Sequence, residues 1–331
     1  MSRDRVFVTY PIPDPGLPML REHFDIDVFG GDQPPAQGWA PIPSSDEIAS
    51  GAAGCQGLLT LVRDRVDDAL LERLPNLRAI ANYGVGYDNI DVAAATARGL
   101  LVSNTPDVLT DATADLTWAL LMAVARRVGE GERMVRSGGF GGWDPRMLLG
   151  ADIVGATLGI VGLGRIGEAV ARRASGFGMH LVHIDDRPGI GAAVGSRAVE
   201  LPELLATADF VTLHCPSTPE THHLIDEAAL RAMKPTAYLL NTARGPIVDE
   251  PALVRALREH WIAGAGLDVY EHEPRLAEGL AQLDNVVVLP HLGSATVGAR
   301  AGMARVAAAN MLAALTGERP PNLVNPDAWR G

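Results

Sequence analysis

Short apolar runs alternate with amphipathic segments along the chain. In the first hundred residues, five apolar runs predict β-strands, and helical patterns lie between them. Strands that are separated by helices are typical of a parallel sheet with crossover helices. The predicted strands are residues 6–9, 26–29, 57–61, 79–82 and 100–103, with helical patterns starting near 17 and running through 70–74.

The alternation pauses in the middle of the chain and then resumes. A helix is expected over 111–124, and its apolar faces predict burial between domains or subunits. Segments 30–43 and 136–149 are rich in Gly or Pro and predict loops. Six later strands predict a doubly wound sheet with its ligand crevice at the strands' carboxyl ends. These strands are 158–161, 181–184, 210–213, 238–240, 264–267 and 286–289, followed by a helix over about 297–315.

The first strand of this second set leads into a glycine-rich turn that opens a helical pattern. Gly162 allows a tight turn, Gly164 lets backbone approach a pyrophosphate, and Gly167 lets helix and strand pack closely. The helix N-terminus offers N–H groups to phosphates. Asp185 ends the next strand, where a ribose-binding carboxylate is expected. Strand, turn, helix and acid together predict dinucleotide binding.

Composition narrows the class of protein. The chain has 331 residues, which suits two domains, and a net charge of −12 argues against a nucleic-acid surface. Cys55 and Cys215 are its only cysteines, so no disulfide framework is expected and the cytoplasm is the predicted location. Neither a signal peptide nor a membrane-spanning apolar run is apparent, so no membrane partner is predicted.

Three residues near the ends of strands in the second half could carry acid–base chemistry. Arg244 follows strand 238–240 and could hold a carboxylate with two parallel hydrogen bonds. His291 follows strand 286–289 and could exchange the proton that accompanies hydride transfer. Glu273 lies beyond strand 264–267 and could favour the charged imidazole. Each residue alone is more often structural, but the three together at one sheet edge predict a catalytic set.

Other polar residues near these strand ends are not expected to take part in catalysis. His214 and Cys215 are expected near the cofactor, with the cysteine as a packing residue rather than a nucleophile. The runs 222–223 and 271–273 contain possible metal ligands, but neither run has convincing ligand spacing. Because hydride transfer with an acid–base histidine needs no metal, we expect no metal site.

Several motifs resemble those of the D-isomer-specific 2-hydroxyacid dehydrogenase family, and the glyoxylate/hydroxypyruvate reductase branch is most similar. The resemblance covers nearly the whole chain. It rests on residues 83–91 (YGVGYDNID), 105–110 (TPDVLT), 162–167 (GLGRIG), 241–245 (NTARG), 266–269 (GLDV) and 290–296 (PHLGSAT).

The resemblance implies an α/β fold of two doubly wound parallel-sheet domains. A Rossmann NAD-binding domain, residues 104–291, would be inserted into a flavodoxin-like substrate domain, residues 1–103 and 292–331. The enzyme would be a homodimer through the segment around 104–150, and Trp143 would reach the partner subunit's active site.

The resemblance also implies the reaction and a site. His291 would be the general acid in reduction of a small 2-oxo acid, Glu273 would orient it, and Arg244 would bind the carboxylate and carbonyl. Backbone N–H groups of Val85 and Gly86 would hold the carboxylate. The implied cofactor contacts are Arg165 and Ile166 at the pyrophosphate and Thr242 and Asp268 near the nicotinamide, while Leu58, Trp143 and Ser294 are candidates for the pocket lining.

The residues favour one cofactor and a small set of substrates, and they leave alternatives for both. A carboxylate at Asp185 accepts from a ribose 2′-hydroxyl and repels a 2′-phosphate, which favours NAD(H), whereas Arg187 leaves NADP(H) open. Glyoxylate and hydroxypyruvate are the first candidate substrates. The alternatives are a phosphite dehydrogenase, which would share the Arg/Glu/His set, and an NAD-sensing protein similar to transcriptional corepressors. A formate dehydrogenase is disfavoured because it would carry glutamine in place of Glu273.

Overall fold

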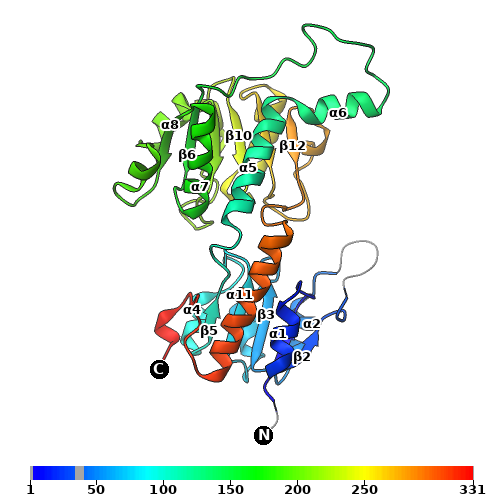
Figure 1. The fold of residues 1–331 in the computed structure, drawn as a ribbon, viewed down its shortest axis with the longest axis vertical. Coiled ribbons are helices and arrows are strands. Elements are labelled where there is room, and N and C mark those ends of the chain that lie inside the picture. Colours follow the sequence, from blue (N-terminus) through cyan, green and yellow to red (C-terminus); the bar gives the residue numbers. More distant parts are fainter. Residues whose placement is uncertain (1–2, 34–40, 331) are drawn as a thin grey trace. The chain divides into compact units, whose positions relative to one another are not determined.

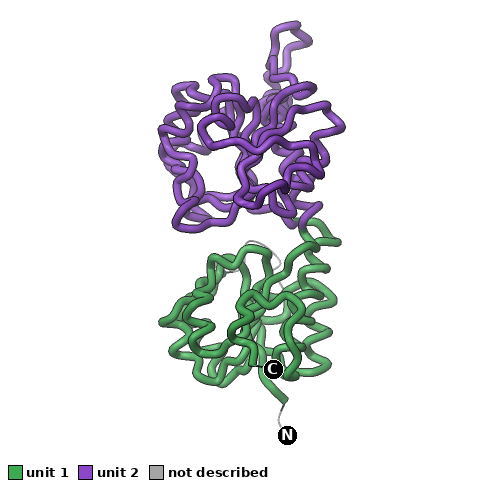
Figure 2. The backbone as a smooth tube through the Cα atoms, turned by 90° about the vertical axis from the view of Figure 1, so that its left-hand side faces the viewer, with its two compact units in different colours: residues 1–109, 295–331 green, residues 110–294 purple. Residues whose placement is uncertain are grey.

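The computed structural model describes residues 3–33 and 41–330, so part of the predicted loop 30–43 lies outside the described residues. The chain divides into two compact units (Figure 2). Unit 1 comprises residues 1–109 and 295–331, and unit 2 comprises residues 110–294. Both ends of the chain therefore belong to one unit, and unit 2 is a continuous insertion.

Unit 1 contains a five-stranded parallel sheet in the order β2-β1-β3-β4-β5, which is the flavodoxin-like order. All five predicted strands are present: β1 (Arg5–Val8), β2 (Asp25–Val28), β3 (Gly57–Leu61), β4 (Ala79–Tyr83) and β5 (Leu101–Ser103). Its helices are α1 (Gly16–His23), α2 (Ser45–Gly51), α3 (Asp68–Glu72), α4 (Val92–Ala97) and α11 (Val297–Thr316).

Unit 2 contains a seven-stranded parallel sheet in the order β12-β11-β10-β9-β6-β7-β8. The six predicted strands are confirmed as β6 (Thr157–Val161), β7 (His180–Ile184), β9 (Phe210–Leu213), β10 (Tyr238–Asn241), β11 (Gly264–Leu267) and β12 (Val286–Val288). The count of six is one short, because β8 (Arg197–Ala198) adds a two-residue edge strand that is too short and exposed to produce an apolar pattern. Strand order reverses between β6 and β9, where doubly wound sheets bind ligands.

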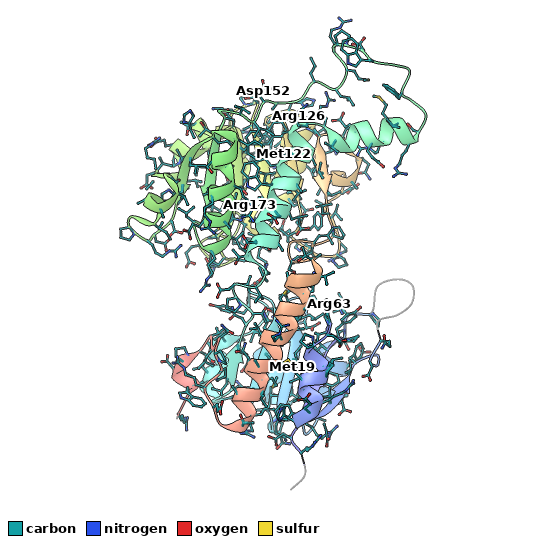
Figure 3. The ribbon with its side chains drawn as sticks, in the orientation of Figure 1. Met19, Arg63, Met122, Arg126, Asp152 and Arg173 are labelled. Carbon is teal, nitrogen blue, oxygen red and sulfur yellow. The ribbon has the colours of Figure 1, made fainter. Side chains whose placement is uncertain are left out.

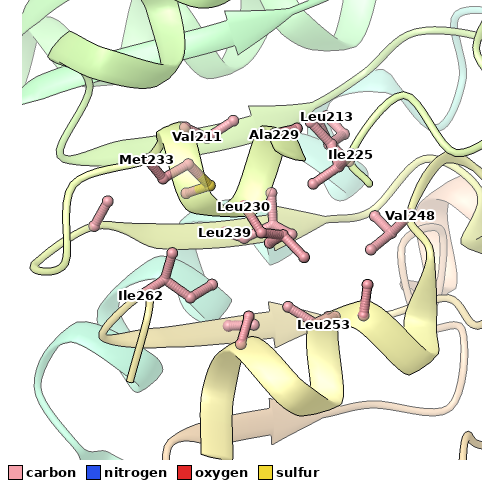
Figure 4. Close-up of a cluster of buried hydrophobic side chains, with 14 of the residues drawn as sticks. Val211, Leu213, Ile225, Ala229, Leu230, Met233, Leu239, Val248, Leu253 and Ile262 are labelled. Carbon is pink, nitrogen blue, oxygen red and sulfur yellow. The ribbon is translucent and has the colours of Figure 1, made fainter. Parts of the chain in front are cut away.

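Helices cover both faces of this second sheet. One face packs against α5 (Thr110–Ala125) and α7 (Arg165–Ala174). The other face packs against α8 (Leu201–Thr207), α9 (Glu227–Ala232) and α10 (Glu250–Arg258), with aliphatic side chains such as Val211, Leu239 and Leu253 between them (Figure 4). Because both faces are covered, the central strands are largely apolar rather than alternating.

The helix predicted over 111–124 is present as α5, and it belongs to the core of unit 2. The Trp118 indole N–H donates to the Val170 carbonyl at 3.1 Å. Arg173 on α7 (Figure 3) forms ion pairs with Asp115 and Asp111 on α5 at 2.8 and 3.0 Å. These contacts fix α5 against α7, the helix that follows the glycine turn.

Helix α6 (Val128–Arg136) was not predicted, and none of its residues is buried. The segment after it, predicted as a loop over 136–149, has no helix or strand. In Figure 1, α6 and this segment extend away from the rest of unit 2. Among the described residues, no helix combines the length and apolarity needed to cross a membrane.

Candidate active site

The glycine turn joins β6 to α7 in a geometry that only glycine allows. Gly162 has a φ of +89°, and a Cβ there would lie 2.6 Å from the backbone nitrogen of Cys215, beyond β9. A Cβ on Gly167 would lie 2.2 Å from the Gly162 carbonyl oxygen, so helix and strand pack in direct contact. A Cβ on Gly164, the N-cap of α7, would meet no atom within 4 Å. The open face of the turn and the helix N-terminus, which has no side-chain cap, fit a pyrophosphate.

The carboxylate of Asp185 already has four hydrogen bonds. It accepts from the Leu163 N–H at 2.9 Å within the glycine turn. It also accepts from Arg187 through its backbone N–H at 3.1 Å, Nε at 2.8 Å and Nη2 at 2.9 Å. The side-chain bonds from Arg187 are the main reason that the pKa of Asp185 falls to about 2. A ribose hydroxyl would therefore have to compete with Arg187, which the sequence pattern did not indicate.

The two residues that follow β9, His214 and Cys215, lie beside the glycine turn and are uncharged near neutral pH. Burial lowers the pKa of His214 to about 3, and its Nε2 lies 2.9 Å from the Thr212 hydroxyl. Burial raises the pKa of the Cys215 thiol to about 11, so the thiol stays protonated and unreactive near neutral pH. Beyond β10, the hydroxyl of Thr242 is hydrogen-bonded to that of Thr117 on α5 at 2.8 Å.

His291 and Glu273 meet beyond β12 and β11. The His291 Nδ1 lies 3.0 Å from the Glu273 Oε2, and about a third of each side chain is exposed. The Glu273 Oε1 accepts from the Tyr270 N–H at 3.1 Å. Burial alone would raise the pKa of Glu273, but its hydrogen bond and attraction to His291 hold it below the usual value. The carboxylate is thus charged, and it leaves the His291 Nε2 as the ring atom that can exchange a proton with a ligand.

Asp268 holds the turn that carries His291. Its carboxylate is fully buried and accepts from the Leu292 and Gly293 N–H groups at 2.6 and 2.7 Å. Its carbonyl accepts from the His291 N–H at 2.9 Å. His291 has a φ of +56°, a strained value for a non-glycine residue, and the three bonds to Asp268 keep it there. Asp268 therefore positions the imidazole, which adds to its predicted place near the nicotinamide.

Arg244 follows β10 in a loop that packs directly on the loop after β11, residues 268–279, which is called the Glu273 loop below. A Cβ on Gly245 would lie within 1.8 Å of the Tyr270 backbone, so only glycine permits this approach. The Arg244 carbonyl accepts from the Asn241 side chain at 2.8 Å, and its Nη1 donates to the Ala243 carbonyl at 2.8 Å. The positive charge of Arg244 also contributes to the lowered pKa of Glu273. Arg244, Glu273 and His291 are thus brought together at one edge of the sheet.

The predicted carboxylate loop lies in unit 1, after β4. The carbonyls of Val85 and Gly86 accept from the side-chain amides of Asn104 and Asn82 at 2.8 and 2.7 Å. In the described part of the chain, the N–H groups of Val85 and Gly86 have no acceptor. Two backbone donors on a braced loop suit a carboxylate ligand.

The remaining predicted residues differ in exposure. Leu58 is enclosed in the core of unit 1, so it cannot line a pocket, and that suggestion is wrong. Ser294 is partly exposed, and 82% of Trp143 is exposed on the segment after α6. Arg165, the first residue of α7, is exposed, whereas Ile166 packs partly against the core.

Sequence reasoning missed how the Glu273 loop is anchored. Glu250, the first residue of α10, is buried, and its carboxylate accepts from the Glu271 and Ala277 N–H groups, both at 2.8 Å. The chain on either side of Glu273 is therefore hydrogen-bonded to the same carboxylate. Asp249, the N-cap of α10, and Pro251 are sequence signals of a helix start, but the distant partners of Glu250 have no local signature.

The two runs of possible metal ligands also come together. Nitrogen atoms of His222 and His223 and a carboxylate oxygen of Glu271 all lie within 4.8 Å of one another. The two runs were considered separately because about fifty positions lie between them in the sequence. In the fold they lie side by side.

Comparison with known proteins matches this architecture. The family model for the NAD-binding domain of D-isomer specific 2-hydroxyacid dehydrogenases matches residues 118–293. The chain belongs to the D-isomer specific 2-hydroxyacid dehydrogenase family, as its sequence motifs predicted.

Similar relatives extend over the whole chain. The glyoxylate reductase of Thermococcus onnurineus is 48% identical, and the alignment covers 98% of this chain and 96% of the relative. The glyoxylate reductase of Korarchaeum cryptofilum is 50% identical, with 98% and 97% covered.

Solved structures show the same fold. A protein from Thermus thermophilus is 46% identical and superposes with a TM-score of 0.87, covering 97% of this chain and 99% of that one. The NADPH-dependent glyoxylate/hydroxypyruvate reductase of Sinorhizobium meliloti, solved with NADP and malonate, is 32% identical with a TM-score of 0.86, covering 100% and 99%.

Proposed function

We propose that this protein reduces small 2-oxo acids, glyoxylate and hydroxypyruvate first among them, to 2-hydroxy acids with a nicotinamide cofactor. The observation that carries the proposal is the hydrogen-bonded pair of His291 and Glu273 beside Arg244, at the edge of an NAD-binding sheet. The names of relatives that are 48–50% identical over nearly the whole chain support the substrate class.

The reaction divides into hydride transfer and proton transfer. A reduced nicotinamide cofactor, held by its pyrophosphate at the glycine turn, would supply the hydride for the carbonyl carbon. His291 donates a proton from Nε2 to the carbonyl oxygen, because its Nδ1 is directed at Glu273. The negative charge of Glu273 stabilises the imidazolium before this transfer. Arg244 binds the carboxylate and polarises the carbonyl through its planar fork.

The two domains have separate tasks in this proposal. The dinucleotide-binding domain, residues 104–291, corresponds to unit 2 apart from a few residues at each boundary, and the substrate domain, residues 1–103 with 292–331, corresponds to unit 1. The substrate carboxylate accepts from the N–H groups of Val85 and Gly86, which the braced loop presents as donors. Ser294 contributes to the pocket lining.

NAD(H) is the proposed cofactor. The Asp185 carboxylate, charged above a pKa of about 2, would accept from the ribose 2′-hydroxyl and repel a 2′-phosphate. Its ion pair with Arg187 weakens this discrimination, because Arg187 is more than half exposed and could turn toward a phosphate. The contacts proposed for the rest of the dinucleotide are Gly162, Gly164, Arg165, Ile166, Gly167, His214, Cys215, Thr242 and Asp268.

The proposed assembly is a homodimer. Large apolar side chains are exposed on α6 and the segment after it, which is unusual for the surface of a monomer. In this proposal the partner subunit covers them, and Trp143 lines the partner's substrate pocket. The exposed set comprises Val128, Val135, Phe140, Trp143 and Leu149.

Oxidation of NADH in the presence of single 2-oxo acids tests the proposed function. Glyoxylate and hydroxypyruvate should be reduced with a higher kcat/KM than larger 2-oxo acids such as phenylpyruvate. Turnover of phosphite with NAD and none with any 2-oxo acid would replace the proposal with a phosphite dehydrogenase. Tight NADH binding without turnover of any substrate would replace it with a sensing function.

A further inference from the structure

A second polar cluster lies on unit 2, outside the Arg244, Glu273 and His291 set. Its members are His222 and His223, which follow β9 by a loop, and Glu271, which follows β11. One nitrogen from each histidine and one oxygen from Glu271 lie within 4.8 Å of one another. Two imidazoles and a carboxylate are ligands that zinc prefers, and His₂Glu sets hold it with a position open to water.

Two of the three ligands are already held in place. The His223 Nε2 lies 2.7 Å from the Glu271 Oε1. The His223 N–H donates to the Pro246 carbonyl at 2.9 Å and keeps this residue at a φ of +52°. The Glu271 N–H is bound by the buried Glu250 at 2.8 Å. Little ordering of these two side chains would be needed when an ion binds, which lowers the entropic cost of the site.

The third ligand needs only a small movement. The rings of His222 and His223 are 4.0 Å apart between centroids and tilted by 32°. His222 is exposed, so its ring can rotate without disturbing the core. Zinc takes nitrogen and oxygen ligands at about 2.0–2.2 Å, so tetrahedral ligand atoms lie about 3.3–3.6 Å apart. The 2.7 Å distance from His223 to Glu271 therefore needs to widen by less than about 1 Å.

We propose that His222, His223 and Glu271 form a binding site for a divalent transition metal ion, with Zn²⁺ as the best match. The ion takes the place of the proton shared by His223 and Glu271, and water completes its coordination. This departs from the expectation of no metal. The site takes no part in hydride transfer, and it ties the loop after β9 to the loop that carries Glu273.

Titration of the tag-free, full-length protein with Co²⁺ tests the proposal, because cobalt in a four-coordinate site absorbs visible light far more strongly than hydrated cobalt. The wild-type protein should bind one equivalent of Co²⁺ per chain with an intense visible band, and Zn²⁺ should displace it. Zn²⁺ should also raise the melting temperature, since an ion that binds only the folded state stabilises it.

His222→Ala is the decisive variant, because its exposed side chain can be removed without opening the core. Loss of even an outer-shell partner weakens metal binding about 10–100-fold, so loss of this ligand should weaken Co²⁺ binding at least about tenfold and abolish the Zn²⁺ effect on melting. His272→Ala, next to Glu271 but outside the cluster, should bind Co²⁺ like the wild type. Absence of an intense band, or equal binding by His222→Ala and wild type, would overturn the proposal.

Discussion

The His291 Nδ1 lies 3.0 Å from the Glu273 Oε2, although the two residues follow different strands. The pair forms because two buried carboxylates hold the backbone segments that carry these residues. Asp268 fixes the turn of His291, and Glu250 fixes both ends of the Glu273 loop. The imidazole is thereby oriented with one nitrogen at the carboxylate and the other available to a substrate.

Glu273→Gln should lower kcat for 2-oxo acid reduction. The amide keeps the shape of the side chain, but it removes the negative charge that faces the His291 Nδ1 at 3.0 Å and stabilises a protonated ring. In the wild type this charge persists to lower pH than that of an ordinary glutamate, because the pKa of Glu273 is lowered. The kcat of both proteins is the measurement, and equal values would contradict the role of Glu273.

Asp268→Asn should slow turnover without direct loss of an acid–base group. The amide presents one N–H₂ group toward a backbone N–H of Leu292 or Gly293, which leaves a buried donor without its acceptor. Such a loss costs about 1–3 kcal/mol, so the melting temperature should fall together with kcat. An Asp268→Asn variant with wild-type kcat would show that the turn does not depend on this carboxylate.

The cofactor preference should respond in opposite directions to two neighbouring substitutions. Asp185→Ser should reduce the ratio of kcat/KM for NADH to that for NADPH, because the charge that repels a 2′-phosphate is lost. Arg187→Ala should increase this ratio, because the nearest cation for that phosphate is removed. Hydrogen bonds to charged groups contribute about 1.5–3 kcal/mol, so each change should be about tenfold or more. A wild-type preference for NADPH would contradict the proposed cofactor.

His214 should make the protein less stable as pH falls below neutral. Its pKa is about 3 in the fold, whereas the ordinary value of 6.5 applies to the unfolded chain. The unfolded chain therefore takes up a proton first, and stability present above pH 6.5 is lost as pH falls toward 3. Between pH 7 and about 5, this histidine should remove about 2 kcal/mol from the free energy of unfolding.

Urea unfolding of the wild type and His214→Gln at these two pH values provides the measurement. The glutamine can keep a hydrogen bond to Thr212 but does not titrate, so its stability should fall less between the two pH values. Equal losses for both proteins would indicate that His214 is protonated in the fold.

The sequence predicted the fold well because its main signals are local. Apolar runs identify the strands, and the glycine turn at Gly162 reports a backbone geometry that other residues cannot adopt. Strand β8 was missed because a two-residue exposed strand produces no apolar pattern. Helix α6 was missed because Gly129 and Gly131 lie within its nine residues, and glycine disfavours a helix.

The catalytic candidates were found because each follows a strand of the same sheet. Their supports were not found, because Glu250, the bond between Asp185 and Arg187, and the cluster of His222, His223 and Glu271 depend on side-chain contacts. The pocket suggestion for Leu58 failed for a related reason, since an apolar residue near a strand end can belong to the core.

The most direct test of the central claim compares wild type with His291→Ala in glyoxylate reduction, with NADH binding measured separately by fluorescence. The wild type should oxidise NADH with glyoxylate. His291→Ala should lose about 10²–10⁴-fold in kcat while its Kd for NADH stays near the wild-type value, because His291 serves proton transfer and not cofactor binding. Wild-type kcat in His291→Ala would contradict the account.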